Sequence, residues 1–329
     1  MGEITSAGQI LSLSTGYWQA STLHAGVRLG VFTVLNEGGR SGEEVAAATG
    51  AHPRATTVLL NALAAMGLLQ KTGDRFTNGP AAARFLVEGT PGYIGYIILH
   101  HHHLVDGWAQ LDTAVRTGEA VEKRSYGEER ERESFQLGMF NLAMAIAPRL
   151  AAEIDLAGRR RLLDLGGGPG TYAIHFCLAN PGLTAVIFDR PTTEPFARAT
   201  VERFGLAGRI DFAAGDFNQT PLPAGCDVAW LSQILHSNGP EACQRLIRKT
   251  RDALAPGGLV MVHEFLLDDS HAAPLFPALF SLNMLVNNGN GRSYSEGDLR
   301  AMLQEAGLKD IRRLAFVGPN DSGIVAGTV

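Results

Sequence analysis

The most restrictive feature of this 329-residue sequence is the stretch LLDLGGGPGTYAIHF, residues 162–176. An apolar run ends in an aspartate, four glycines and a proline follow, and an apolar helical pattern then begins. A strand, a glycine-rich turn and a helix in this order predict the first β-α unit of a parallel sheet, with a ligand close to the bare backbone. The free N–H groups at the start of the helix favour an anion, either a phosphate or a carboxylate.

The rest of the second half repeats this alternation from about Arg159 onward. Further segments read as mostly apolar strands separated by helical segments: LTAVIFD, RIDFAAGD, DVAWLSQILH and GGLVMVHEFLL. Strands that are apolar on both faces predict a parallel sheet covered by helices on both sides. We therefore expect an α/β fold for the second half of the chain.

The first half has a helical rhythm instead. Ser41 stands three residues before Glu44, which predicts a capping box at the start of a helix. HPRATTVLLNALAAMGLLQKTG reads as one longer amphipathic helix, and GDRFTNGPAA reads as a short hairpin or wing. These segments predict a winged-helix-like domain. The following region is expected to be helical, with the charged stretch EKRSYGEERERE on a solvated helix or loop.

Composition argues against several classes of function. Residues 21–90 contain six Lys or Arg and five Asp or Glu, a net charge of +1, whereas a DNA reader carries a basic face. The apolar surface of the longer helix is therefore expected to pack on another subunit, not on nucleic acid. The apolar runs are much shorter than the ~18 residues of a membrane span, and we expect no membrane partner or signal peptide. Three scattered cysteines favour a reduced, cytoplasmic location.

The spacing of the glycines distinguishes between nucleotide ligands. Gly166, Gly168 and Gly170 form G-x-G-x-G, and Thr171 takes the place of the third glycine in the dinucleotide pattern G-x-G-x-x-G. The sequence also has no GxxxxGK[ST] loop for a nucleoside triphosphate. The nicotinamide and P-loop interpretations therefore fail, and a ligand without phosphates is favoured.

Two acidic residues at later strand ends complete this prediction. Asp189 ends the second strand, where a carboxylate can accept hydrogen bonds from both ribose hydroxyls. Asp216 follows the next strand beside Phe217, and this pair could bond and stack on an adenine. An adenosine joined to an amino acid, without phosphate, is S-adenosylmethionine.

Five motifs in order, DLGGGPG, IFDRP, GDF, LSQILH and LAPGG, strongly resemble the class I S-adenosylmethionine-dependent methyltransferases. The helical front half is similar to that of homodimeric small-molecule O-methyltransferases, a group with plant caffeate and flavonoid enzymes and bacterial polyketide relatives. The resemblance implies a Rossmann-like domain with a seven-stranded, mostly parallel sheet, preceded by an all-α winged-helix-like dimerisation domain. It divides the chain into a dimerisation domain (1–90), connecting helices that contribute to the acceptor pocket (91–155) and a donor-binding domain (156–329).

The resemblance also implies the reaction, which is transfer of a methyl group to a hydroxyl of a small aromatic or polyketide-like acceptor. His236, just past the fourth strand, falls on the histidine that deprotonates this hydroxyl. A histidine pKa of ~6.5 against ~10 for a phenol makes neutral imidazole a usable base. Glu264, at the end of the fifth strand, is expected to orient the imidazole and stabilise its cation.

The remaining site residues are carried over from the family. The predicted donor-binding residues are Asp164, Gly166, Gly168, Gly170, Asp189, Asp216, Phe217, Ser232 and Met139. The predicted acceptor-binding residues are Met284, Asn287 and Asn288, whose amides could bond acceptor oxygens. Consecutive side chains such as His100–His103 cannot all converge on one ion, and we expect no metal. His263 and His175 are interpreted as packing residues.

Two departures from the plant pattern leave other reactions open. Ser237 follows the predicted base where plant members have aspartate, and Ser293 stands where they carry a second glutamate. One anionic support of the imidazole is therefore missing. The alternatives are a C-methyltransferase or a non-methylating enzyme on the same fold, and a winged-helix regulator that senses a ligand.

Overall fold

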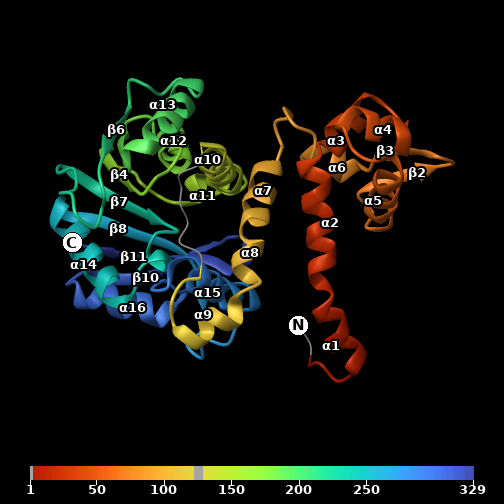
Figure 1. Cartoon of the computed structure of the whole chain (residues 1–329). Helices are drawn as coiled ribbons and strands as arrows, with labels where there is room; N and C mark the ends of the chain where they lie inside the picture. Colours follow the sequence, from red (N-terminus) through yellow and green to blue (C-terminus); the bar gives the residue numbers. More distant parts are fainter. Residues whose placement is uncertain (1–2, 122–128) are drawn as a thin grey trace. The chain divides into compact units, whose positions relative to one another are not determined.

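The computed structural model describes residues 3–121 and 129–329 (Figure 1). It divides into two compact units, which are described separately. The N-terminal unit comprises Met1–Val105 and Glu128–Leu142, and the C-terminal unit comprises Asp106–Gly127 and Ala143–Val329. The predicted connecting region, 91–155, thus contributes to both units. Residues 122–128 of its charged stretch lie outside the described residues.

The N-terminal unit is helical, as expected, and carries a small sheet of order β1-β3-β2. Its helices are α1 (Ala7–Ser14), α2 (Gly16–Arg28), α3 (Val31–Val34), η1 (Leu35–Glu37), α4 (Gly42–Thr49), α5 (Pro53–Ala65), α6 (Pro80–Phe85), α7 (Gly95–His103) and most of α10 (Glu129–Met144). Its strands are β1 (Arg40–Ser41), β2 (Leu69–Thr72) and β3 (Arg75–Asn78). β3 lies in the segment predicted as a hairpin or wing, GDRFTNGPAA, and it pairs with β2, which precedes that segment.

The helix α5 ends earlier than its apolar pattern predicts. A single helix was expected from His52 to Gly73, but α5 stops at Ala65 and LQKT forms β2. Gly67, with φ of 78°, takes the left-handed conformation that terminates helices. The capping box of Ser41 and Glu44 is confirmed, because each side chain accepts a hydrogen bond from the other residue's backbone N–H.

The helix α1 buries none of its residues within the chain. The core of the N-terminal unit is instead built from α2, α3, α5, β3 and α7. Large apolar side chains remain exposed along α1 and the start of α2: Ile10, Leu11, Leu13, Tyr17 and Trp18. An apolar surface of this kind marks an interaction site.

The C-terminal unit is an α/β domain around a sheet of order β10-β11-β8-β7-β4-β5-β6, with β9 beside β8. β6, β5, β4, β7 and β8 pair in parallel, and β11 runs antiparallel to both of its neighbours. The strands are β4 (Arg161–Leu165), β5 (Thr184–Asp189), β6 (Ile210–Ala214), β7 (Cys226–Ser232), β8 (Leu254–Leu267), β9 (Tyr294–Ser295), β10 (Lys309–Val317) and β11 (Ser322–Thr328). The mostly parallel sheet is as predicted.

Helices cover both faces of this sheet (Figure 1). One core includes α11 (Ala147–Glu153), α12 (Thr171–Ala179) and α13 (Glu194–Arg203), and the opposite core includes α14 (Pro240–Ala253) and α16 (Glu296–Glu305). The other helical elements are α8 (Val105–Trp108), α9 (Leu111–Thr117), η2 (Pro191–Thr193), η3 (Leu235–Ser237), α15 (Leu275–Asn288) and η4 (Pro319–Asp321). Among the described residues, the helices are too short or too polar to cross a membrane.

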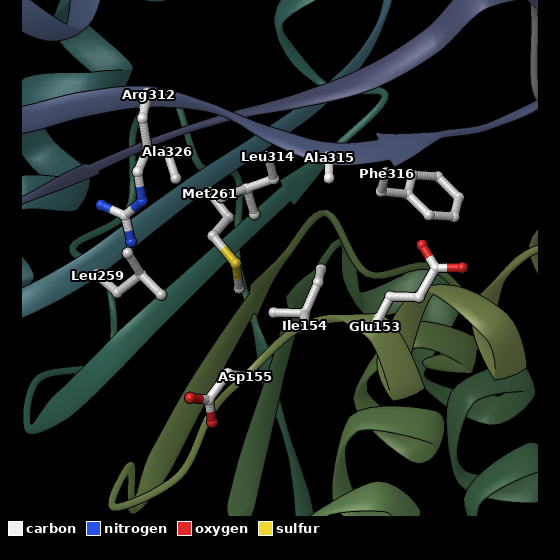
Figure 2. Close-up of a pocket in the computed structure, with 10 residues that line it drawn as sticks. All are labelled: Glu153, Ile154, Asp155, Leu259, Met261, Arg312, Leu314, Ala315, Phe316 and Ala326. Atoms are coloured by element: carbon white, nitrogen blue, oxygen red, sulfur yellow. The ribbon is translucent and has the colours of Figure 1, made fainter.

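A hollow of about 370 Å³ lies between the end of α11 and the strands β8, β10 and β11. Figure 2 shows the Met261 side chain reaching toward Ile154 there, with the polar side chains of Glu153, Asp155 and Arg312 around it. The predicted site residues are absent from its described lining. The predicted residues at or just beyond the ends of β4, β5, β6, β7 and β8 lie instead at the carboxyl edge of the sheet.

Candidate active site

The glycine-rich loop between β4 and α12 requires its glycines for two reasons. Gly166, Gly168 and Gly170 all have positive φ, at 66°, 54° and 78°, in the region that other residues rarely adopt. Packing adds a second constraint, because a Cβ on Gly166 would lie 2.2 Å from Cδ1 of Ile234. The loop backbone therefore approaches the end of β7 more closely than any side chain would permit.

This loop connects the carboxylates at the ends of β4 and β5. Asp189 accepts a hydrogen bond from the backbone N–H of Gly168 (2.8 Å) and another from that of Arg190 (2.6 Å). Asp164 accepts one from the backbone N–H of Ala173 in α12 (3.1 Å), and a Cβ on Gly167 would lie 2.6 Å from its carboxyl carbon. Two of the predicted acidic residues thus meet at one turn, as parallel strands with a common carboxyl edge require.

Burial sets the electrostatics of these two acids. It raises the pKa of Asp164 to about 7, and the nearby charge of Asp189 adds to the effect. Burial also raises the pKa of Asp189 above its ordinary value, against the hydrogen bonds that lower it. Two neighbouring carboxylates that are costly to ionise would be stabilised by a cationic ligand. The hydroxyl of Thr171, at the start of α12, is also buried and has no hydrogen-bond partner among the described residues.

Asp216 and Phe217 lie beyond the end of β6, the strand that pairs with β5. One oxygen of Asp216 accepts the backbone N–H of Asn218 (2.9 Å), which shapes the turn. The ring of Phe217 lies against the glycine loop, since a Cβ on Gly166 would be 3.7 Å from its Cε1. An apolar ring beside the bare loop is the feature expected for an adenine site.

The predicted base and its partner are in direct contact. His236 Nδ1 lies 2.7 Å from Oε2 of Glu264, and both side chains are largely buried. The other carboxylate oxygen, Oε1, accepts the backbone N–H groups of Ile234 and Leu235 at 2.8 Å each. Glu264 therefore holds the segment that carries the histidine as well as the imidazole itself.

The carboxylate of Glu264 also explains why the strand that carries the histidine segment ends earlier than expected. The segment DVAWLSQILH was predicted to be one strand, but β7 ends at Ser232 and η3 begins at Leu235. Gln233 between them has φ of 59°, which breaks the extended backbone. Because Glu264 accepts the N–H groups of the turn, these donors do not need a neighbouring strand.

Ser232 contacts a residue that sequence reasoning assigned to packing. Its hydroxyl lies 2.9 Å from Nδ1 of His263 on the adjacent strand. His263 also stacks on Trp230, with centroids 5.5 Å apart, and burial lowers its pKa to about 4. His263 is thus both a packed ring and a neutral hydrogen-bonding partner of Ser232.

An aromatic surface beside His236 was missed from the sequence. The ring of Phe280 on α15 stands edge-on to the imidazole, with centroids 4.9 Å apart. Phe265 and Phe276 lie against Phe280, with centroids 5.0 and 6.0 Å away. The i,i+4 spacing of Phe276 and Phe280 in LFPALFSLNML was the available signal, but it equally describes a core helix.

The predicted acceptor-binding residues also lie on α15. Met284 is one turn beyond Phe280, and the Asn288 side-chain amide donates to the backbone carbonyl of Ser237 (2.6 Å). Asn287 donates to Asn283, which in turn accepts from Trp108, and sequence reasoning did not find these two partners.

Met139 lies on α10 in the N-terminal unit, where it packs against that unit's core. Its role at the donor stays a prediction. The histidine run forms the end of α7, where the rings of His100 and Phe135 are 5.2 Å apart and those of His102 and His24 are 5.7 Å apart.

Comparison with known proteins identifies the family of the chain. Residues 108–309 match the O-methyltransferase domain family, and residues 11–88 match the O-methyltransferase dimerisation domain family. The chain belongs to the O-methyltransferase family. It is 36% identical over 325 residues to a 3-hydroxy-5-methyl-1-naphthoate 3-O-methyltransferase of Streptomyces sahachiroi, with 97% of this chain and 94% of the relative covered.

Two further similarities extend over nearly the whole O-methyltransferase chain. A tetracenomycin polyketide synthesis 8-O-methyl transferase of Streptomyces glaucescens is 34% identical, with 98% of this chain and 97% of the relative covered. The structure of human N-acetylserotonin methyltransferase in complex with S-adenosylmethionine is similar with a TM-score of 0.87 at 26% identity, covering 100% of this chain and 99% of that one. The protein is an S-adenosylmethionine-dependent O-methyltransferase, and its dimerisation domain supports homodimer formation.

Proposed function

We propose that this enzyme methylates a hydroxyl on an aromatic, polyketide-like ring, with His236 as the general base and Glu264 as its supporting carboxylate. The observation that carries the proposal is the 2.7 Å contact between His236 Nδ1 and Glu264 Oε2 at the carboxyl edge of the sheet. A base held in one orientation at this edge is what a proton transfer from a bound phenol requires.

The contact also determines which nitrogen acts. An ionised carboxylate only accepts hydrogen bonds, so Nδ1 of neutral His236 carries the hydrogen that Glu264 receives. Nε2 then holds the lone pair and is the atom that accepts the acceptor's proton. Once His236 is protonated, its positive charge lies beside Glu264, which stabilises it. One direct carboxylate thus supports the base even though Ser237 and Ser293 replace the acidic residues of plant relatives.

The methyl donor supplies an activated methyl group on a sulfonium. We propose that Asp189 receives its ribose hydroxyls, with Phe217 and Asp216 at its adenine and the glycine loop and Asp164 along its amino-acid end. The fit rests on the closely packed glycines and on two buried carboxylates with raised pKa values, which favour a cationic ligand. We also assign Ser232 and Met139 to this site.

The class of acceptor is inferred from two independent features. The relatives include a naphthoate and a tetracenomycin O-methyltransferase, and Phe265, Phe276 and Phe280 form an aromatic surface beside His236. Aromatic side chains favour offset or edge-on contact with a bound ring. Met284 lies on the same helix and would flank that ring.

We further propose that the exposed apolar side chains of α1 and early α2 form part of the homodimer interface, within a dimerisation domain at residues 1–90. Residues 91–155 would contribute to the acceptor pocket, and residues 156–329 would bind the donor. The hydrogen bond from Trp108 to Asn283 supports a contribution of the connecting region to the acceptor side. A cytoplasmic location stays a prediction, consistent with three free, buried cysteines.

The experiment is a methyl-transfer assay over a panel of phenols and hydroxynaphthoates with His236→Ala. We expect turnover to fall by ~100-fold or more while S-adenosylhomocysteine affinity stays within about twofold, because the base acts only on the acceptor. His271→Ala is the matched control, since His271 pairs with Asp298 in a half-exposed ion pair. Unchanged turnover in His236→Ala would remove this histidine from the proposed role.

A further inference from the structure

Three side chains of the C-terminal unit form a chain of hydrogen bonds. The indole Nε1 of Trp108 on α8 donates to the side-chain oxygen of Asn283 on α15 (3.0 Å). The side-chain amide nitrogen of Asn287, one turn further along α15, donates to the backbone carbonyl of Asn283 (2.7 Å) and to the same side-chain oxygen (3.1 Å). We call these residues the Trp-Asn-Asn chain.

The direction of this chain follows from its first member. An indole nitrogen can only donate, so Asn283 must turn its oxygen toward Trp108. Both groups of Asn283 that face Asn287 are then acceptors, and Asn287 must present its NH2 group to them. A flipped Asn287 amide would place oxygen against two oxygens. The assignment of its nitrogen and oxygen, often ambiguous for an asparagine, is therefore determined by its neighbours.

The remaining atom of this amide is its oxygen, Oδ1. Oδ1 of Asn287 is buried and accepts no hydrogen bond among the described residues. A buried acceptor left unpaired loses the hydrogen bond it would make with water, so a donor in a bound molecule would be favoured there. Because the NH2 group already donates to Asn283, Asn287 can only accept a hydrogen bond from such a molecule, through Oδ1.

The position of α15 places Asn287 on the side of the site proposed for the methyl acceptor. Phe280, Met284 and Asn287 have i, i+4 and i+7 spacing and share one face of the helix. Phe280 contacts the ring of His236, and Asn288 donates to the backbone carbonyl of Ser237, the next residue after the base. The end of α15 that carries Asn287 is thus attached to the segment of the proposed base.

We propose that Asn287 selects methyl acceptors that carry a hydrogen-bond donor, such as a second hydroxyl or an N–H group, in addition to the hydroxyl that is methylated. The proposal rests on the proposed function of this site and specifies its substrate class. It gives a direction to the expectation from sequence, in which Asn287 and Asn288 could bond acceptor oxygens. The NH2 group of Asn287 is committed to Asn283, and that of Asn288 donates one hydrogen bond to the carbonyl of Ser237.

The test uses pairs of ligands that differ only in this donor. Each dihydroxynaphthalene isomer is compared with the methoxynaphthols made from it, two for an unsymmetrical isomer and one for a symmetrical isomer. In each ether, one hydroxyl becomes a group that accepts a hydrogen bond but cannot donate one. Affinity is measured by calorimetry with the dimeric enzyme saturated with S-adenosylhomocysteine, so that binding is scored without turnover. For at least one isomer, one hydroxyl of the dihydroxy compound should donate a hydrogen bond to Asn287. We expect the wild type to bind this compound about tenfold more tightly than the methoxynaphthol in which that hydroxyl is methylated.

Two variants and one control assign this preference to the Trp-Asn-Asn chain. Asn287→Leu should bring the affinity ratio close to one, because the unpaired acceptor is gone. Trp108→Phe keeps a ring but removes the indole N–H, while the backbone carbonyl of Asn283 still holds the NH2 group of Asn287, so the ratio should stay above one. Asn290→Leu makes the same change at an exposed asparagine and should keep the wild-type ratio.

The outcomes separate this proposal from the proposed reaction. Equal affinity within every pair, or a preference that survives in Asn287→Leu, overturns the role of Asn287 even if a hydroxyl is methylated. Failure of every compound to bind also contradicts it. A preference that depends on Asn287, without methyl transfer to any member of the panel, would contradict the proposed reaction. It would still support selection by Asn287 of ligands that donate a hydrogen bond.

Discussion

At the scale of single residues, Glu264 has two tasks at once. One oxygen contacts the imidazole of His236, and the other accepts the backbone N–H groups of Ile234 and Leu235. The first contact sets the tautomer of the base, and the second shapes the turn that carries it. Substitutions can separate these tasks, because an amide keeps an acceptor oxygen but loses the charge.

We predict that Glu264→Gln folds but lowers the rate of methyl transfer by about 10- to 100-fold, since the imidazolium loses its anionic partner. Glu264→Ala should in addition destabilise the fold by about 1–3 kcal/mol, because buried N–H groups lose their acceptor. Steady-state kinetics and thermal melts measure the two effects. Equal rates for wild type and Glu264→Gln would contradict the charge-based role.

Asp164 leads to a prediction about pH in the donor-free enzyme. The unfolded chain ionises this acid near its ordinary pKa of 3.8, whereas the folded protein holds the proton up to about pH 7. Folding therefore binds a proton between these values, and the stability that Asp164 contributes falls as the pH rises from about 4 to about 7. His263 has the opposite effect on stability between about pH 4 and pH 6.5. Its pKa is lowered in the folded protein, so the stability that it contributes falls as the pH falls below 6.5.

Comparison of Asp164→Asn with the wild type isolates the first effect, since His263 is present in both proteins. We expect the stability of the variant relative to wild type to rise by about 2 kcal/mol between pH 5 and pH 8. Chemical denaturation at pH 5, 6, 7 and 8, in the absence of S-adenosylmethionine, measures this difference in stability. A difference that stays constant over this range would show that Asp164 titrates normally.

At the scale of elements, the loop between β4 and α12 depends on glycine at defined positions. Gly166→Ala would put a Cβ on a residue with φ of 66°, 2.2 Å from Cδ1 of Ile234. We expect a loss of about 1–3 kcal/mol in unfolding free energy and at least a tenfold loss in S-adenosylhomocysteine affinity, because the loop must move. Gly182→Ala is the control, as a Cβ there contacts nothing within 4 Å. Equal donor affinity in both variants would argue against close packing of the loop.

At the scale of the whole molecule, α1 buries none of its residues, and its domain belongs to a family of dimerisation domains. Leu11 is 67% exposed within the chain and should be buried in the dimer. We predict that Leu11→Asp raises the dimer dissociation constant at least tenfold, since a charge would enter an apolar interface. Light scattering at micromolar concentration measures it. Val115→Asp, at a side chain of similar exposure on α9, should leave the dimer intact.

The parts of the fold that could be predicted from sequence are those whose conformation is determined by a short segment of the chain. The glycine loop, the capping box of Ser41 and the apolar strands each depend on neighbours within a few residues. They occur where expected, except that β7 ends at Ser232 and not at His236. The contact of His236 with Glu264 was also expected, because adjacent parallel strands bring their carboxyl ends to one edge. The end of α5 was missed, since the apolar spacing continues through Gly67 into β2.

The sequence by itself therefore determined the two kinds of domain, the donor that the loop suits and the pair proposed for proton transfer. Only the tertiary structure decided the aromatic surface at His236, the raised pKa of Asp164 and the orientation of the Asn287 amide. Local backbone preferences are encoded over a few residues. Burial and hydrogen-bond direction, by contrast, arise when distant segments meet, as Trp108 and Asn283 do across 175 positions of the chain.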